Sequence, residues 1–159
     1  MKSDLKTIIE THNISWCLID VAGVFYNQAG QILDHAKQAV AMLYEQNIKV
    51  GLMTNNSMQH PSVIKQWFET HDVYLDENAI MSSGLCLIYD EQLNSMIRDK
   101  AVYVEGRDSC YQYFTEAGVR QLVDSPETAD VVALMSHSGE PDISYISYLA
   151  GIINDRKIP

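Results

Sequence analysis

Two short polar sequences, each directly after an apolar run, carry the residue types best suited to chemistry. The run Trp16–Ile19 ends on the carboxylate of Asp20, and Gly23 follows three residues later. A second run, Lys49–Met53, ends on Thr54-Asn55-Asn56-Ser57, which offers hydroxyl and amide groups. Because the carboxyl ends of parallel strands meet at one edge of a sheet, these groups could converge there. Together they could bind a phosphoryl group and a divalent cation.

The segments around these two runs predict an α/β fold with a parallel sheet. Apolar runs that read as strands alternate with segments whose apolar residues recur at helical spacing, which is the order of a Rossmann-like half-sheet. Asp34 is the expected N-cap of the helix after the first strand, and Asn47 its expected end. The turn residues Asn27–Gly30 predict a hairpin over Phe25–Leu33. The methionines of the apolar runs, Met53 and Met81 among them, are expected to fill the core.

Composition and charge narrow the classes of partner. The chain has 159 residues, 47% of them apolar, and 21 acidic against 11 basic residues give a formal net charge of -10. Such a surface repels a phosphate backbone, so nucleic acid is not an expected partner. No apolar run approaches the roughly 20 residues that span a bilayer, so no membrane is expected either. Three cysteines without metal-type spacing read as reduced thiols of a cytoplasmic protein, and the five scattered histidines are expected at the surface or in loops.

The two polar sequences resemble motifs I and II of the haloacid dehalogenase (HAD) phosphohydrolase superfamily. The segments are Asp20-Val21-Ala22-Gly23-Val24-Phe25-Tyr26 and Thr54-Asn55-Asn56-Ser57. They are most similar to class IIA, the nitrophenylphosphatase-like and N-acetylglucosamine-operon phosphatases. There the motifs usually read Asp-x-Asp-Gly-Val-(Leu/Ile)-(Tyr/Trp) and Thr-Asn-Asn-Ser. The second half also resembles this branch, because Val102–Gly106, Glu116–Gly118 and Ala129–Val132 are similar to the start of its inserted cap.

The resemblance implies a site and a reaction. Asp20 would be the nucleophile, forming an aspartyl-phosphate, and would also bind Mg²⁺. Thr54, Asn55 and Asn56 would bind or brace the site of the transferring phosphoryl group, and the Phe25–Leu33 hairpin would be a flap over it. The substrate would be a small phosphorylated metabolite. The expected architecture is a half-core with motifs I and II over residues 1–80 and part of a class IIA-type cap over residues 81–159, so the chain is expected to be truncated within the cap.

Ala22 departs from the family pattern. The family has Asp at this position, where its backbone carbonyl binds Mg²⁺ and its side chain protonates the leaving group and later activates water. Ala22 can supply the carbonyl but neither proton transfer. Loss of a general acid/base typically costs about 10²–10⁴-fold in rate. The alanine is either a natural departure or an engineered change that traps a complex, and either way a weak or inactive phosphatase is expected.

Two other functions stay open. A non-catalytic HAD-like binding or regulatory protein would also explain Ala22 and the lack of counterparts to the motif III Lys and the motif IV acidic pair. A flavodoxin- or receiver-like domain would need an acidic pair at the end of an earlier strand and a late Lys, and neither is evident. Because a half-core leaves apolar surface and a sheet edge uncovered, self-association into a homo-oligomer is expected.

Overall fold

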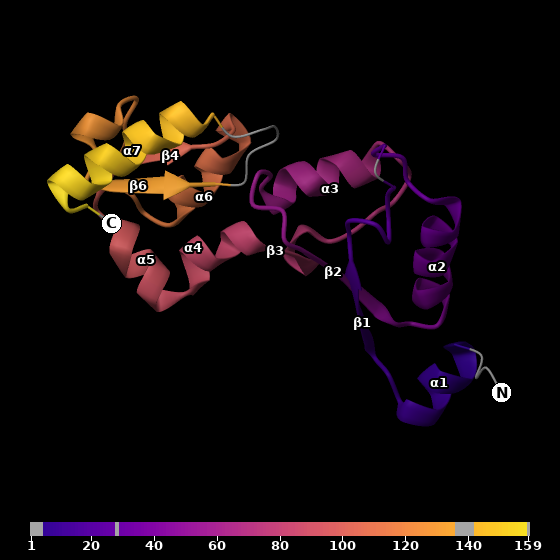
Figure 1. Ribbon diagram of the computed structural model, residues 1–159. Coiled ribbons are helices and arrows are strands. Elements are labelled where there is room, and N and C mark those ends of the chain that lie inside the picture. Colours follow the sequence, from indigo (N-terminus) through magenta and orange to yellow (C-terminus); the bar gives the residue numbers. More distant parts are fainter. Residues whose placement is uncertain (1–4, 28, 136–141, 159) are drawn as a thin grey trace. The chain divides into compact units, whose positions relative to one another are not determined.

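The computed structural model describes residues 5–27, 29–135 and 142–158. It divides the chain into two units, Met1–Thr54 with Ile64–Met81, and Asn55–Val63 with Ser82–Pro159. Each unit contains its own parallel strands, as the predicted α/β class requires (Figure 1). The chain leaves the first unit directly after Thr54, re-enters it at Ile64, and leaves it again after Met81.

The first unit is built on a three-stranded sheet in the order β1-β2-β3. Its elements are α1 (Leu5–His12), β1 (Trp16–Asp20), α2 (Asp34–Glu45), β2 (Lys49–Thr54), α3 (Pro61–Glu69), a short 3-10 turn (Glu77–Ala79) and β3 (Ile80–Ser82). The first turn of α3 and the last residue of β3 belong to the second unit. Strands β1 and β2 run parallel, and their register runs from Trp16 opposite Lys49 to Asp20 opposite Met53.

Helix α2 ends where the sequence predicts, but its N-cap lies one residue earlier than predicted. Asn47 has φ 57°, and the amides of Asn47 and Ile48 bond back to the carbonyls of Tyr44 and Leu43, which closes the helix. The N-cap is Leu33 and no side chain caps the helix, so the assignment of Asp34 as N-cap is wrong. Asp34 is instead the first helical residue, where its carboxylate still favours the positive end of the helix dipole.

Only one face of the β1–β2 pair is packed. Cys17, Ile19, Val50 and Leu52 lie in or against the first core, which α2 and α3 complete with residues such as Leu43 and Phe68. The other face leaves four large apolar side chains exposed, those of Trp16, Leu18, Met53 and Met81. The expectation that Met53 and Met81 fill the core is therefore wrong. The strands of these two methionines are apolar on both faces, but the described residues cover only one of the two faces.

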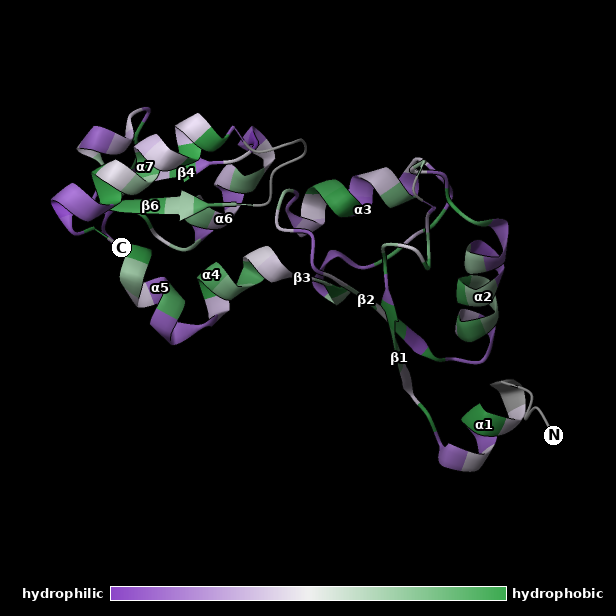
Figure 2. Cartoon of the chain, in the orientation of Figure 1, coloured by the Kyte–Doolittle hydropathy of each residue, from purple (hydrophilic) through white to green (hydrophobic). Residues whose placement is uncertain are grey.

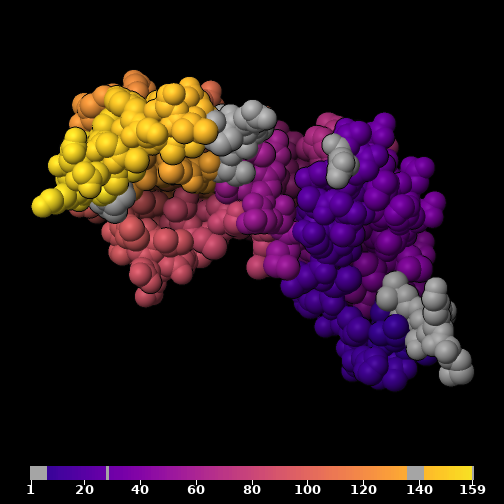
Figure 3. All heavy atoms as spheres, viewed as in Figure 1, coloured from indigo at the N-terminus to yellow at the C-terminus, as the bar shows by residue number. Residues whose placement is uncertain are grey.

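The second unit contains the strands β5-β4-β6, again parallel. Its elements are α4 (Cys86–Tyr89), α5 (Glu91–Ile97), β4 (Ala101–Glu105), α6 (Tyr111–Glu116), β5 (Gln121–Leu122), β6 (Val131–Leu134) and α7 (Ile143–Arg156), with short 3-10 turns at Ser83–Leu85, Asp108–Cys110 and Pro126–Thr128. Figure 2 shows β6 as a largely hydrophobic strand, and its first residue, Val131, lies in the second core. Figure 3 shows α7 at the surface of this unit, where Leu149 is its one buried residue.

Candidate functional site

Asp20 ends β1 with an exposed carboxylate, as a nucleophile at a sheet edge would require. Its Oδ1 accepts a hydrogen bond of 2.9 Å from the backbone N–H of Val21. The chain then folds back tightly: the N–H of Gly23 bonds to the carbonyl of Tyr26 at 3.0 Å, and that of Phe25 to the carbonyl of Val21 at 2.9 Å. These bonds fix the backbone beside the carboxylate while leaving the side chain in solvent.

Gly23 is required by its backbone conformation and not by crowding. Its φ is 80°, a region that residues with a Cβ atom enter only with strain. No heavy atom lies within 4 Å of the position a Cβ would take, so the space for a side chain exists. The motif I glycine therefore permits the turn that follows Asp20.

Thr54 lies at the same end of the sheet as Asp20, but its side chain is on the opposite face. It ends β2 and directly follows Met53, the residue opposite Asp20 in the register. Strand alternation places Thr54 on the packed face with Leu52, and its side chain is only 6% exposed. The structure thus places Asp20 and Thr54 at the carboxyl ends of two neighbouring strands, with Asp20 open to solvent and Thr54 buried. Contact of Thr54 with a phosphoryl group stays a prediction.

Asn55 and Asn56 belong to the second unit. The backbone carbonyl of Asn55 accepts a hydrogen bond of 3.1 Å from Ser83 Oγ. The side-chain oxygen of Asn56 accepts one of 2.8 Å from the N–H of Met58, and its amide nitrogen donates to Gln59 Oε1 at 3.4 Å. Asn56 therefore braces a turn within its own loop. Its place beside Asp20, and that of Asn55, stays a prediction.

The Phe25–Leu33 segment folds into the predicted hairpin. Tyr26 and Ile32 form an antiparallel bridge, and the N–H of Leu33 bonds to the carbonyl of Phe25 at 2.8 Å. The side-chain oxygen of Asn27 accepts hydrogen bonds from the amides of Ala29 and Gln31 and so closes the turn. The ring of Tyr26 packs edge-on against Trp67 of α3. The hairpin starts from the loop that follows Asp20, where a flap would have to start.

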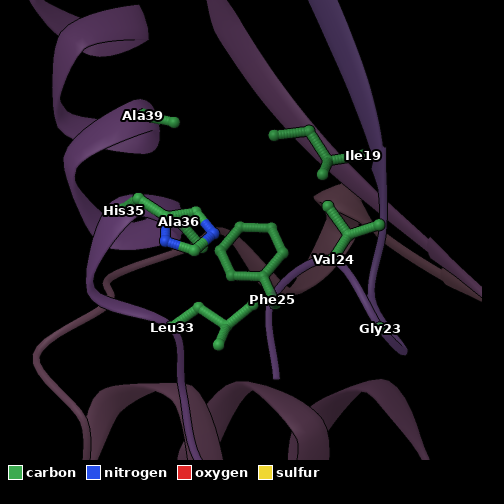
Figure 4. Close-up of a pocket in the computed structure, with 8 residues that line it drawn as sticks. All are labelled: Ile19, Gly23, Val24, Phe25, Leu33, His35, Ala36 and Ala39. Atoms are coloured by element: carbon green, nitrogen blue, oxygen red, sulfur yellow. The ribbon is translucent and has the colours of Figure 1, made fainter. Parts of the chain in front are cut away.

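An apolar hollow of about 310 Å³ lies next to the Asp20 loop. Figure 4 shows the side chains that line it from β1, the loop and the start of α2: Ile19, Val24, Phe25, Leu33, His35, Ala36 and Ala39. Gly23 completes the lining, and His35 contributes the one polar side chain. Apart from His35, this lining offers a phosphate no polar side chain.

The expected metal ligands are few in the part of the chain that the structure describes. There, no three His, Cys, Asp or Glu side chains gather as a metal-binding group. The assigned donors are thus one carboxylate, Asp20, and one backbone carbonyl, that of Ala22. Mg²⁺ usually takes one or two carboxylates together with substrate phosphate and several waters. A Mg²⁺ held by Asp20 and the Ala22 carbonyl jointly with a phosphate stays a prediction.

Sequence reasoning missed a buried polar network in the second unit. His60 lies in a loop, as one of the two expected positions for the histidines has it, but its side chain is only 4% exposed. Its Nε2 lies 3.2 Å from Glu116 Oε2 and its Nδ1 lies 2.9 Å from Ser62 Oγ. Tyr113, also fully buried, packs against the His60 ring. Glu116 and Tyr113 lie more than 50 residues from His60, so no local pattern reveals these contacts.

The segments that contain these residues match a known protein family. The model of the haloacid dehalogenase-like hydrolases matches residues 17–120, which include Asp20, Gly23 and the Thr54–Ser57 sequence. The chain belongs to the haloacid dehalogenase-like hydrolase family. No curated protein sequence matches it. In this HAD-like chain no described helix is long and apolar enough to cross a membrane.

Several solved structures share the fold at low sequence identity. A possible sugar phosphatase of the HAD superfamily from Cytophaga hutchinsonii superposes with a TM-score of 0.77 at 17% identity, over 100% of this chain and 57% of that one. A double mutant of a thermostable NPPase from Geobacillus stearothermophilus gives 0.67 at 20% identity, over 91% and 54%. A glycerol phosphate phosphatase from Mycobacterium tuberculosis in complex with calcium gives 0.69 at 15% identity, over 91% and 41%. The chain therefore spans about half the length of the structures that it matches.

Proposed function

We propose that this chain carries the part of a HAD-type phosphatase site that contains the nucleophile. Asp20 would be this nucleophile, and the substrates would be small phosphorylated metabolites. The observation that supports this most is the exposed Asp20 carboxylate at the carboxyl end of a parallel strand, followed by the positive-φ glycine of the family motif. The net charge of -10 disfavours a nucleic-acid substrate, whereas a small phosphate needs only local compensation of its charge.

The reaction would proceed by phosphoryl transfer to the chain. An Asp20 carboxylate oxygen attacks phosphorus and the bond to the leaving oxygen breaks, which gives an aspartyl-phosphate. Water then attacks this acyl phosphate, releases inorganic phosphate and restores Asp20. Thr54 and the amides of Asn55 and Asn56 would position the phosphoryl oxygens. Mg²⁺ held by Asp20 and the Ala22 carbonyl would offset negative charge on the phosphoryl group.

Ala22 limits this chemistry. The methyl side chain is exposed beside Asp20 and has no proton to give, so the leaving oxygen must take its proton from solvent. This loss matters least for aryl phosphates, whose leaving groups depart as stable anions. Turnover of aryl phosphates is therefore expected to exceed that of alkyl phosphates by a wide margin.

A non-catalytic binding protein of the same fold is the second candidate, and Ala22 is the observation that favours it. It predicts that the chain binds inorganic phosphate with Mg²⁺ and releases none from an ester. The turnover assay separates the two functions, because phosphate binding in titration calorimetry is expected of both.

The deciding experiment is release of inorganic phosphate from 4-nitrophenyl phosphate with and without Mg²⁺. We expect slow Mg²⁺-dependent turnover that Asp20→Asn abolishes. Asp34→Asn is the matched control, because Asp34 is another exposed aspartate of the first unit and lies outside the proposed site. Turnover that survives Asp20→Asn would rule out Asp20 as the nucleophile.

A further inference from the structure

The loop that follows Thr54, here called the motif II loop and comprising Asn55–His60, is held by side chains of its own unit. Four of its backbone carbonyls accept hydrogen bonds from side chains far away in the sequence. Ser83 Oγ donates to the carbonyl of Asn55 at 3.1 Å, and Cys110 Sγ to that of Ser57 at 3.3 Å. Ser109 Oγ donates to the carbonyl of Met58, and the Tyr113 hydroxyl to that of Gln59 at 2.5 Å. Three of these donors come from one stretch, Ser109–Tyr113.

Tyr113 is the most firmly placed of these donors. Its side chain is fully buried, and its hydroxyl lies 2.6 Å from Ser82 Oγ as well as 2.5 Å from the Gln59 carbonyl. A carbonyl can only accept, so the single phenol proton goes to Gln59 and the Ser82 hydroxyl donates to the phenol oxygen. The ring also packs against Gly84, where an added Cβ would come within 2.5 Å of it.

His60 fixes the end of the same loop to the same helix. Its Nε2 bonds to Glu116 on α6, one turn beyond Tyr113, and its Nδ1 accepts from the N–H of Ser62 at 3.3 Å. Gln112 links the two partners, because its amide donates to Glu116 Oε1 at 2.8 Å and its oxygen accepts from Ser62 Oγ at 3.2 Å. The loop is thus anchored at Asn55, at its middle carbonyls and at His60.

Anchored carbonyls determine where the loop's N–H groups point. The peptide unit is planar and trans, so the carbonyl of one residue and the N–H of the next point in opposite directions. A carbonyl turned toward Tyr113 or Ser109 therefore turns the following N–H away from that side chain. Amide N–H groups are the donors that such loops offer to phosphoryl oxygens.

We infer that Tyr113 is a positioning residue for the motif II loop, with Ser109 as a second one, so that α6 and the turn before it set the loop's conformation for phosphate binding. The phosphate-binding part rests on the proposed function. The role of the two side chains is indirect, because they act on backbone carbonyls and not on substrate. Their loss should loosen the loop while the strands and α7 of the same unit keep their stability.

The test compares Tyr113→Phe with Tyr111→Phe by amide hydrogen exchange and by phosphate titration. Tyr111 lies on the same helix and is 37% exposed, so its variant makes the same chemical change away from the loop. An ordinary hydrogen bond of about 1 kcal/mol corresponds to a roughly fivefold effect. We expect about fivefold faster exchange or more at the Asn55–His60 amides in Tyr113→Phe, about twofold or less in β6 and α7, and no change in Tyr111→Phe. The dissociation constant of inorganic phosphate with Mg²⁺ should rise by about the same factor.

Uniformly faster exchange across the second unit would overturn the inference, because Tyr113 would then be an ordinary core residue. So would unchanged exchange in the loop, or a loosened loop that binds phosphate as tightly as before. Ser109→Ala with Ser109→Thr provides a second test if Tyr113→Phe does not fold: exchange should rise in the first variant and be restored in the second. If the unaltered chain binds no phosphate, the proposed function fails, while the exchange data still decide whether these side chains hold the loop.

Discussion

Tyr113 donates a 2.5 Å hydrogen bond to the backbone carbonyl of Gln59, although 54 residues separate them. Gln59 lies in the loop that follows the first unit's strand β2, and Tyr113 lies on helix α6 of the second unit. By its contacts the motif II loop therefore belongs with residues far downstream and not with the strand that precedes it. A family motif defined by local sequence is divided between two structural units directly after Thr54.

The buried phenol of Tyr113 predicts a specific loss of stability at alkaline pH. Burial, the main cause, raises the pKa of Tyr113 from 10.0 to about 12. Because the pKa is higher in the folded state, the contribution of Tyr113 to stability is fully present below pH 10 and is lost as the pH rises from 10 to 12. In that range Tyr113 of the unfolded chain releases its proton and Tyr113 of the folded chain keeps it. In that window the free energy of unfolding should fall by up to about 1.4 kcal/mol per pH unit more in the unaltered chain than in Tyr113→Phe. Urea unfolding from pH 8 to 11.5 measures this, and parallel curves would contradict it.

Two exposed glycines should respond to alanine in opposite directions. Gly23 and Gly151 both have space for a Cβ, since nothing lies within 4 Å of either position. Gly23 has φ 80° in the turn after Asp20, so alanine there should cost about 1 kcal/mol through strain. Gly151 lies inside α7, where alanine should stabilise the helix by about 1 kcal/mol. Thermal unfolding of both variants checks this, and a Gly23→Ala variant as stable as the parent would mean that the turn has another conformation in solution.

Signals of short range allowed the sequence to predict the strands β1 and β2, the turn at Asn27–Gly30 and the helix stop at Asn47. Each depends on neighbouring residues alone. The strand pattern alone predicts a buried Met53, because an apolar parallel strand normally has helices on both faces, but here only one face is covered. Among the site residues, Asp20 lies at the expected strand end, but the burial of Thr54 follows from strand alternation combined with packing by distant helices. The anchors of the motif II loop are long-range contacts and leave no periodic signal.

Asp130 predicts loss of stability in acid. Its Oδ2 accepts 2.8 Å hydrogen bonds from the N–H of Ala101 and from Arg120 Nη2. The backbone bond from Ala101, helped by the charge of Arg120, lowers the pKa of Asp130 below its usual 3.8. A lowered pKa contributes stability that is present above pH 3.8 and lost as the pH falls through the folded-state value. Asp130→Asn should therefore be less stable than the parent at pH 7 and lose less stability below pH 4.

The comparison for this prediction is Asp124→Asn, because Asp124 is an exposed aspartate of the same unit. Chemical unfolding at pH 7 and at several values between 2 and 5 gives both stability curves. If Asp124→Asn and Asp130→Asn behaved alike, the bonds to Ala101 and Arg120 would have no measurable effect.

The uncovered face of the first sheet predicts association with a second copy of the chain. Among the described residues β1 pairs with β2 alone, so its outer edge is open beside Trp16 and Leu18. Lys49 of β2 lies over the Trp16 ring at one end of the uncovered face, and Asp20 lies at the other end, so an antiparallel copy packed on this face would bring opposite charges together. Sedimentation should show a concentration-dependent dimer that Leu18→Lys weakens and Leu93→Lys, on exposed α5 surface, does not. A monomer at every concentration would refute this.

Ala22→Asp should raise turnover, and the leaving group should determine by how much. The side chain of Ala22 is exposed, so a carboxylate can be placed there without burying charge. A general acid/base typically contributes about 10²–10⁴-fold, and its contribution grows as the leaving group becomes more basic. The gain should therefore approach the upper value for an alkyl phosphate and be small for 4-nitrophenyl phosphate. Rates for the parent, Ala22→Asp and Ala22→Asn on both esters separate proton transfer from polarity, since the amide cannot act as the acid. An equal gain on the two esters, or the same gain with Ala22→Asn, would show that position 22 takes no part in proton transfer here.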